Sequence, residues 1–252
     1  MKKLIVTAAA AAAVAYPASA GAATFKGTVV ERLAGRHVLV VAARSGTAWS
    51  VHTTSAARVG AVVTVSATAR RDGTFSASRV AVTGRAHRAR LHGVVLQSVA
   101  GLTFLSAGRS VVLVHSRGRA LAAVGSHGPQ PGAVANVGVS IGANGSLTAT
   151  SITATGQQAN TIVIQATVTA ITPATATTAG SLTLSVNGQA LVVPLAPGTV
   201  LPATLVPNST ITLTISFGSG DATATSADDE DDDQGDDDQG DDNDDQGDDD
   251  GS

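Results

Sequence analysis

Carboxylates are the most concentrated chemically active side chains in this sequence, and they lie at its C-terminal end. From Asp228 to Asp250 they occur in groups of two to six, separated by Gln-Gly at 234–235, 239–240 and 246–247. Hard oxygen ligands of this kind suit Ca²⁺ or Mg²⁺. The candidate ligands for weak divalent-cation binding are Asp231, Asp232, Asp233, Asp236, Asp237, Asp238, Asp241, Asp242, Asp244, Asp245, Asp248, Asp249 and Asp250.

The spacing of these carboxylates does not fit a specific calcium loop. An EF-hand needs Asp-x-Asp/Asn-x-Asp/Asn-Gly and an acid six residues after the glycine. The best start, Asp242, has Gln246 at the fifth position and runs out of chain before the twelfth. So many like charges repel one another and cannot be buried, which predicts a disordered, solvating tail. We therefore expect no cofactor beyond weak Ca²⁺ association.

Basic residues are densest between positions 85 and 92, where Arg85, Arg88 and Arg90 are the candidate contacts for a polyanion or for the chain's own tail. Residues 21–220 carry fourteen basic side chains against two carboxylates, whereas seventeen carboxylates follow from Asp221 onward. Nucleic-acid binding that tolerates any sequence also uses aromatic side chains on which bases stack, and no aromatic residue is interleaved with this cluster. We expect cell-envelope polyanions as partners and no nucleic acid. The cluster is alternatively a linker that its charge keeps soluble.

Catalytic and metal-binding patterns are missing from the rest of the chain. The six histidines do not pair at ligand spacing, and there is no cysteine to complete a zinc site. Glu31 and Asp72 are the only carboxylates before Asp221, and the turn already explains Asp72, so a site that needs two carboxylates is hard to build. The sequence therefore predicts no catalytic residues and no enzyme.

The elements that carry these residues are short strands. Runs such as Val38–Val41, Val62–Val65 and Val111–Val114 are rich in β-branched residues, which suit a pleated, half-buried surface. Asp72-Gly73 and Asn144-Gly145 separate such runs and predict tight hairpin turns of the primed type. Strands recurring about every ten residues predict an all-β fold of small barrels or sandwiches.

Internal similarity divides the body into tandem modules. The segment from Asp72 to Val80 reappears from Asn144 to Ile152, and Val59-Gly60-Ala61-Val62 reappears from Pro131 to Val134. We expect module 1 at 24–84, module 2 at 85–157 with a short insertion around 125–130, and a degenerate module 3 at 158–222. The disordered acidic tail is expected at 223–252.

The repeated motifs resemble a family of secreted bacterial proteins of unknown function. The shared features are an apolar-x-Gly-x-Val opening strand, a central Gly-x-Val-Val strand and an Asp/Asn-Gly-x-apolar-x-Ala ending. The resemblance covers Phe25–Gly84 and Leu91–Gly156 well, and Thr161–Thr225 poorly. It implies repeated small β-barrels similar in outline to the OB fold, in a bacterial extracellular or envelope setting. It implies no catalytic residues.

The N-terminus has the pattern of a signal peptide. Lys2 and Lys3 precede an apolar, Ala-rich run, and Ala18-Ser19-Ala20 offers the small residues that a signal peptidase requires. This run is too short to span a bilayer, so we expect signal peptide 1–20, no transmembrane anchor and a secreted or loosely envelope-associated protein.

Three functions remain open from the sequence. The first is a non-catalytic secreted envelope or extracellular protein that makes weak polyelectrolyte contacts with cations or polyanions. The second is a calcium-responsive binding protein that uses the acidic tail. The third is an enzyme of unknown class. The opposite charges of body and tail also predict an intramolecular contact between them.

Overall fold

The computed structural model of the protein describes residues 22–116, 129–218 and 221–229. The predicted signal peptide, most of the predicted insertion and all candidate cation ligands from Asp231 to Asp250 lie outside these residues. Within the described part of the chain, no helix is long and apolar enough to cross a membrane.

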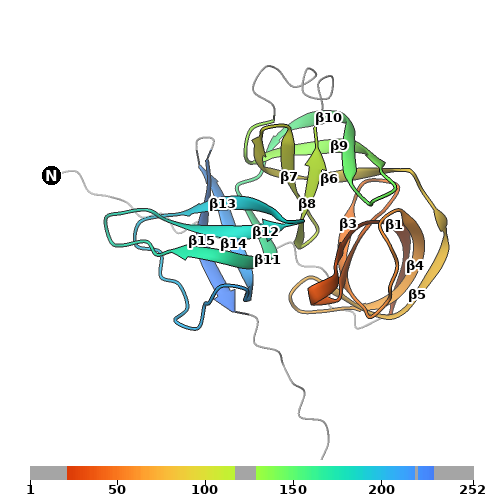
Figure 1. Ribbon diagram of the computed structural model, residues 1–252, viewed down its shortest axis with the longest axis horizontal. Helices are drawn as coiled ribbons and strands as arrows, with labels where there is room; N and C mark the ends of the chain where they lie inside the picture. The colour runs from red at the N-terminus through yellow and green to blue at the C-terminus, as the bar shows by residue number, and fades with distance from the viewer. Residues whose placement is uncertain (1–21, 117–128, 219–220, 230–252) are drawn as a thin grey trace, which may run out of the picture.

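The described chain forms fifteen strands in three closed five-stranded barrels (Figure 1). Barrel 1 contains β1 (Ala23–Leu33), β2 (Val38–Ala42), β3 (Ala48–His52), β4 (Ala61–Ala69) and β5 (Phe75–Arg85), with the 3₁₀ turn η1 (Ala34–Arg36) after β1. Barrel 2 contains β6 (Arg88–Val99), β7 (Leu102–Ala107), β8 (Ser110–His115), β9 (Ala133–Ile141) and β10 (Leu147–Gln158). Barrel 3 contains β11 (Thr161–Thr172), β12 (Gly180–Val186), β13 (Gln189–Leu195), β14 (Thr210–Gly218) and β15 (Asp221–Asp229). The expected all-β fold of tandem small barrels is confirmed.

All three barrels share one strand order. In barrel 1 the order around the sheet is β1-β2-β3-β5-β4, with β4 returning to β1. Neighbouring strands are antiparallel except for a short parallel pairing of β3 with β5, as Val51 pairs with Phe75. This arrangement is the Greek-key barrel of the OB fold. Barrels 2 and 3 repeat it, with parallel pairs Thr148–His115 and Leu195–Ala224.

The third barrel closes although its sequence repeat is weak. Its last strand, β15, pairs with β14 along its whole length, from Asp221 opposite Gly218 to Asp229 opposite Ile211. The strand therefore continues beyond residue 223, where we expected a disordered tail to begin. Thr and Ala alternate from Ala222 to Thr225, and threonine favours a strand.

The hairpin turns differ in type from our expectation. Asp72 and Asn144 do not have positive φ, and only their glycines do, at 78° for Gly73 and 84° for Gly145. In each turn the glycine N–H donates to the carbonyl three residues earlier, so a type I turn is followed by one left-handed glycine. The primed type predicted for these two turns is wrong. It occurs instead at Asn187-Gly188, where both φ values are positive.

Glycines on the first strands of barrels 1 and 2 allow a close approach of the second strand. A methyl group at Gly27 would lie 2.5 Å from the carbonyl oxygen of Ala42 on β2. The equivalent methyl group at Gly93 would overlap the carbonyl oxygen of Ser106 on β7. These two positions therefore have no room for any side chain.

Candidate functional site

The outer surface of strands 2 and 3, with the loops that join strands 1–2 and 4–5, is where OB barrels bind oligonucleotides and oligosaccharides. In barrel 1 this surface is covered by barrel 2. Val40 and Ala42 of β2 and Ala48 of β3 belong to the same buried apolar cluster as Leu91 and Leu105 of barrel 2. Barrel 1 therefore cannot offer this face to a ligand.

Barrel 2 uses the same face to contact barrel 3. Phe104 of β7 and Leu113 of β8 are buried in one cluster with Ile164 and Leu182 of barrel 3. The packing repeats, because strands 2 and 3 of each of the first two barrels pack on the next barrel. Two of the three OB faces are thus occupied within the chain.

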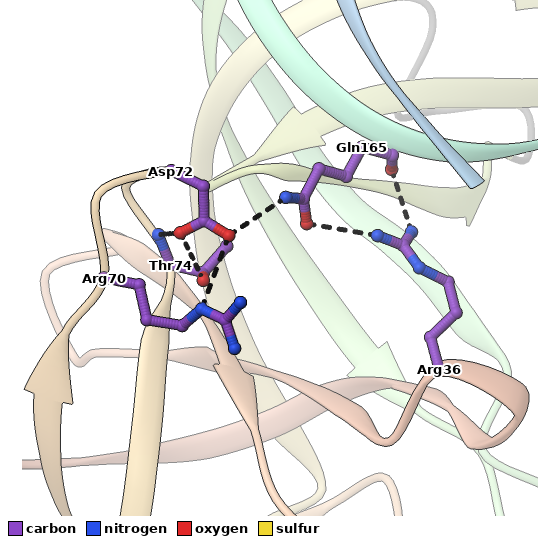
Figure 2. Close-up of polar contacts among 5 residues, drawn as sticks. All are labelled: Arg36, Arg70, Asp72, Thr74 and Gln165. Carbon is purple, nitrogen blue, oxygen red and sulfur yellow. Dashed lines mark hydrogen bonds and ion pairs between the residues drawn. The ribbon is translucent and has the colours of Figure 1, made fainter. Parts of the chain in front are cut away.

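The loops of barrel 1 that would complete its binding site also contact barrel 3 (Figure 2). Arg36, between strands 1 and 2, donates from Nη1 to the carbonyl oxygen of Gln165 and from Nη2 to its Oε1, both at 3.1 Å. Gln165 donates from Nε2 to Oδ2 of Asp72, between strands 4 and 5, at 3.3 Å. Gln165 is only 2% exposed. One buried amide therefore joins both loops of barrel 1 to β11.

Asp72 has several partners in its own turn. Its Oδ1 accepts hydrogen bonds from the backbone N–H of Thr74 at 2.8 Å and from the Thr74 hydroxyl at 2.6 Å. Arg70 Nε lies 3.6 Å from Oδ2. Partial burial raises the pKa of Asp72, but the Thr74 bonds, the Arg70 charge and the Gln165 bond together lower it below its ordinary value. Asp72 is thus a charged, structural member of the contact.

Glu31 forms the second contact between barrels 1 and 3. Its side chain is 2% exposed, and its Oε2 accepts a hydrogen bond from Asn187 Nδ2 at 3.0 Å. Asn187 lies in the β12–β13 turn, where its φ is positive. Burial raises the pKa of Glu31 to about 7, and the bond from Asn187 offsets only part of this rise.

Removing the Gln165 side chain is expected to destabilise the protein. Gln165→Ala would remove the bond to Asp72 Oδ2 and the bond from Arg36 Nη2, while the Thr74 and Arg70 contacts of Asp72 and the Arg36 bond to the backbone carbonyl remain. Losing these two partly buried bonds should cost about 1–3 kcal/mol. Guanidinium unfolding followed by Trp49 fluorescence measures this change. Gln157→Ala, at an exposed position on β10, is the control and should change stability little. Equal stability of the two variants would show that the Gln165 contacts contribute nothing.

The third OB face is free and uncharged. The outward residues of β12 and β13 are Ser181, Thr183, Ser185, Ala190, Val192 and Pro194, which are exposed or half-buried. None is basic or aromatic. This face therefore offers neither phosphate contacts nor stacking platforms.

A basic face lies instead on β6 and β9 of barrel 2. Arg88, Arg90 and His92 are exposed and alternate along β6 with residues that point inward. They pair across the sheet with Ser140, Gly138 and Asn136 respectively, so all six positions share one surface. His92 Nδ1 lies 2.9 Å from Asn136 Oδ1. We call Arg88, Arg90 and His92 the arginine face.

A hollow of about 450 Å³ on barrel 1 extends this basic region. Arg58, in the β3–β4 loop, and Arg85, at the end of β5, both line it. Arg85 is separated from Arg88 only by the two-residue connection between β5 and β6. Of the three arginines predicted as polyanion contacts, the structure therefore places Arg88 and Arg90 on one sheet face and Arg85 in the neighbouring hollow.

Metal-ligating side chains and aromatic rings do not form a second candidate site in the described part of the chain. Within the described ranges, no three His, Cys, Asp or Glu side chains are arranged to hold a metal ion. Phe25 contacts Trp49 in a tilted arrangement and Phe75 edge-on in barrel 1, with ring centroids 4.5 and 5.3 Å apart. These three half-buried rings pack against the core of barrel 1 and do not belong to the arginine face.

Arg36, Arg58 and Gln165 were not predicted from the sequence, and no structural role was predicted for Glu31. One signal was present for two of them. Glu31 follows Thr-Val-Val, and Gln165 follows Thr-Ile-Val-Ile, so each is a polar residue directly after an apolar run in a strand. Such a residue either reaches solvent or has a buried partner. Arg58 carries no comparable signal.

Comparison with known proteins yields solved structures only. No family model matches the chain, and no curated protein matches it. The chain is similar to Drosophila Unr, in a structure described as CSD456, with 13% identity, a TM-score of 0.20 and coverage of 82% of this chain and 97% of that one. It is similar to a multidomain protein with nucleic acid binding domains from Streptococcus pneumoniae, with 12% identity, a TM-score of 0.23 and coverage of 81% and 72%.

Two expectations conflict with these neighbours and are corrected. The first is the exclusion of nucleic acid as a partner, and the second is an envelope function through weak contacts with cations or polyanions. The exclusion relied on the lack of stacking aromatics, yet phosphate contacts alone supply non-specific nucleic-acid binding. At these TM-scores no residue or role transfers to this chain. The expected contact between tail and body falls outside the described residues.

Proposed function

We propose that the protein binds nucleic acid through phosphate contacts at the junction of barrels 1 and 2, and that it has no catalytic role. The observation that carries this proposal is the arginine face beside the Arg58–Arg85 hollow. Guanidinium groups present planar sets of donors that suit phosphate oxygens. Arginines of β6, of the end of β5 and of the β3–β4 loop, gathered at one junction, can therefore follow a sugar–phosphate backbone.

The positions of the acidic side chains also support the arginine face as the binding site. Among the residues whose side chains the structure describes, the carboxylates are Glu31 and Asp72. Both are engaged in the contact between barrels 1 and 3, with Asn187 and Gln165 respectively. Among the described side chains, no carboxylate therefore offsets the positive charge of the arginine face, and positive charge attracts a polyanion and speeds its association.

The expected binding is weakly sequence-specific. Base recognition needs side chains that read base edges or stack on bases, whereas phosphate contacts position the ligand without reading it. None of the described Phe or Trp rings belongs to the arginine face, so affinity should come mainly from counterion release. Such binding has a dissociation constant of roughly 10⁻⁴–10⁻⁶ M at physiological salt.

We also propose that this binding takes place outside the cell. The predicted signal peptide at 1–20 and the resemblance to secreted bacterial proteins support export. The ligand would then be extracellular nucleic acid. The chain has no cysteine, so an oxidising extracellular environment would not change its covalent structure through disulfides.

Replacing the arginine face is expected to weaken binding selectively. Arg88→Gln/Arg90→Gln should lower the affinity for a labelled 20-nucleotide single strand roughly tenfold at 50 mM salt, because two phosphate contacts are lost. The slope of log K against log salt should fall by about 1.4, since each contact on a single strand contributes about 0.7. Fluorescence anisotropy of the full-length protein at several salt concentrations measures both quantities.

A double variant of equal charge provides the control. Arg32→Gln/Arg71→Gln changes two exposed arginines at the end of β1 and in the β4–β5 turn, away from the arginine face. This control should retain most of the affinity and most of the salt slope. Equal losses in the two double variants, or no binding by the unmodified protein, would contradict the proposed site.

A further inference from the structure

Backbone hydrogen bonds hold the segments that form the hollow on barrel 1. The N–H of Ala61 donates to the carbonyl of Arg58 at 2.9 Å, which closes the end of the β3–β4 loop. The N–H of Gly60 donates to Val29 at 2.8 Å, and Gly60 in turn accepts from the N–H of Ala86 at 2.8 Å. These bonds connect the loop to β1 and to the β5–β6 connection. The backbone that carries both arginines is therefore held in place before any ligand arrives.

The two arginines that line the hollow come from different elements of barrel 1. Arg58 belongs to the loop, whereas Arg85 ends β5 and pairs across the sheet with Ala61. Both side chains are exposed, and neither guanidinium makes a hydrogen bond or ion pair with the described residues. Their donors are available to an anionic group.

The surface between the arginines is apolar. Ala57 and Val59 line the hollow, and so does Val82, whose side chain is 59% exposed. An exposed valine beside two unpaired cations does not fit a purely ionic site. It fits a ligand that carries both an anionic group and a flat apolar body, and the volume of about 450 Å³ lies within the range of small-molecule sites.

We propose that the hollow receives one nucleotide unit of the bound strand, with its phosphate on one guanidinium and its base against the other guanidinium and Val82. Guanidinium planes serve as stacking surfaces for unpaired bases when aromatic rings are lacking. The arginine face begins three residues beyond Arg85, so it would hold the neighbouring phosphates. This inference rests on the proposed function and adds to it a defined subsite and a preference for single strands.

The smallest complete probe of this subsite is adenosine 5′-monophosphate. We expect its titration into isotope-labelled full-length protein to shift the backbone amide signals of residues 55–61 and 82–86. Arg58→Gln and Arg85→Gln should each weaken this binding at least about fivefold, because one charge-assisted contact is lost. Arg79→Gln, an exposed arginine on β5 that does not line the hollow, is the matched control and should bind as the unmodified protein does.

Two simpler probes separate a nucleotide site from an anion site. Inorganic phosphate lacks the base and adenosine lacks the phosphate, so each should bind more weakly than the nucleotide. If phosphate alone binds as tightly as the nucleotide, or if the two variants bind as the Arg79→Gln control does, the inference is wrong.

Failure of this subsite can be told apart from failure of the proposed function. A 20-nucleotide strand that binds the unmodified protein, but loses no more affinity to Arg58→Gln/Arg85→Gln than to Arg32→Gln/Arg71→Gln, removes the subsite and leaves nucleic-acid binding intact. A strand that does not bind the unmodified protein removes both. A twofold or greater preference for single strand over a duplex of equal length, lost in Arg58→Gln/Arg85→Gln, supports the subsite.

Discussion

Raising the pH from 4.5 to 8 is expected to lower the stability of the folded protein by about 3 kcal/mol through Glu31 alone. Burial raises the pKa of this carboxyl from 4.5 to about 7 in the folded state. Between these two values the folded chain holds a proton that the unfolded chain has released. The stabilising contribution is therefore complete below pH 4.5 and is lost as the pH rises through 7, at about 1.4 kcal/mol per pKa unit.

The comparison with Glu31→Gln isolates this effect from every other titrating group. The glutamine stays neutral at all pH values and keeps an oxygen that can accept the Asn187 bond. Guanidinium unfolding between pH 4 and 8, followed by the fluorescence of the single tryptophan Trp49, should give two curves that converge at low pH. At pH 8 the variant should be the more stable of the two. Parallel curves over the whole range would show that Glu31 ionises as it does in the unfolded chain.

Asp72 changes the stability in the opposite direction as the pH rises, and it does so in a more acidic pH range. Its pKa is lowered in the folded state, so its contribution is present at neutral pH and is lost in acid, as the pH falls through its folded pKa. Because Asp72 is common to both proteins, its contribution cancels in the difference between them. The same holds for the carboxylates of the tail.

A single methyl group at Gly93 is expected to be the most damaging small substitution in the described chain. In Gly93→Ala the new carbon would overlap the carbonyl oxygen of Ser106, and both atoms belong to paired strand backbones that cannot move independently. We expect a loss of more than about 3 kcal/mol, in the range seen for severe overpacking. Chemical denaturation followed by far-ultraviolet circular dichroism measures it.

Gly84→Ala is the matched control, because Gly84 also lies in a strand but a methyl group there would meet nothing within 4 Å. It should be neutral or slightly stabilising, since alanine restricts the unfolded chain. If Gly93→Ala does not yield soluble protein, Gly27→Ala gives a second test, with its methyl group 2.5 Å from the Ala42 carbonyl oxygen. Either variant matching Gly84→Ala in stability would contradict the close strand approach.

The strands of this protein could be located from sequence because β-branched runs and turn residues mark them. Whether one or both faces of a strand are buried could not be predicted as reliably. Val38–Val41 was expected to be half-buried, yet all five residues of β2 (Val38–Ala42) are buried, since barrel 2 covers the outer face of this strand. An uninterrupted apolar run is typical of a strand buried on both sides, whereas Ser-Leu-Thr-Leu-Ser in β12 alternates and keeps one face in solvent.

The candidate site was only partly predictable for a related reason. Arg85, Arg88 and Arg90 are close in sequence, so their clustering was visible, and strand pairing only determined which face each one occupies. Arg58 joins them through the fold of the β3–β4 loop, which no local pattern specifies. Glu31 and Asn187 lie 156 positions apart, and the pKa of Glu31 depends on a surface that barrel 3 supplies. Such properties arise from tertiary packing and have no counterpart in local sequence.

The contacts of Gln165 and Asn187 with barrel 1 also bear on the order in which the protein folds. In an open array of repeats each unit touches only its neighbours, and folding can begin anywhere and spread. Here Arg36 meets Gln165 across 129 positions, so barrels 1 and 3 contact each other as well as barrel 2. Contacts between such distant positions carry a loop-closure cost that neighbouring strands do not. Docking of barrel 3 on barrel 1 should therefore be the last step of folding, and the first barrel should complete its native contacts only when the third has formed.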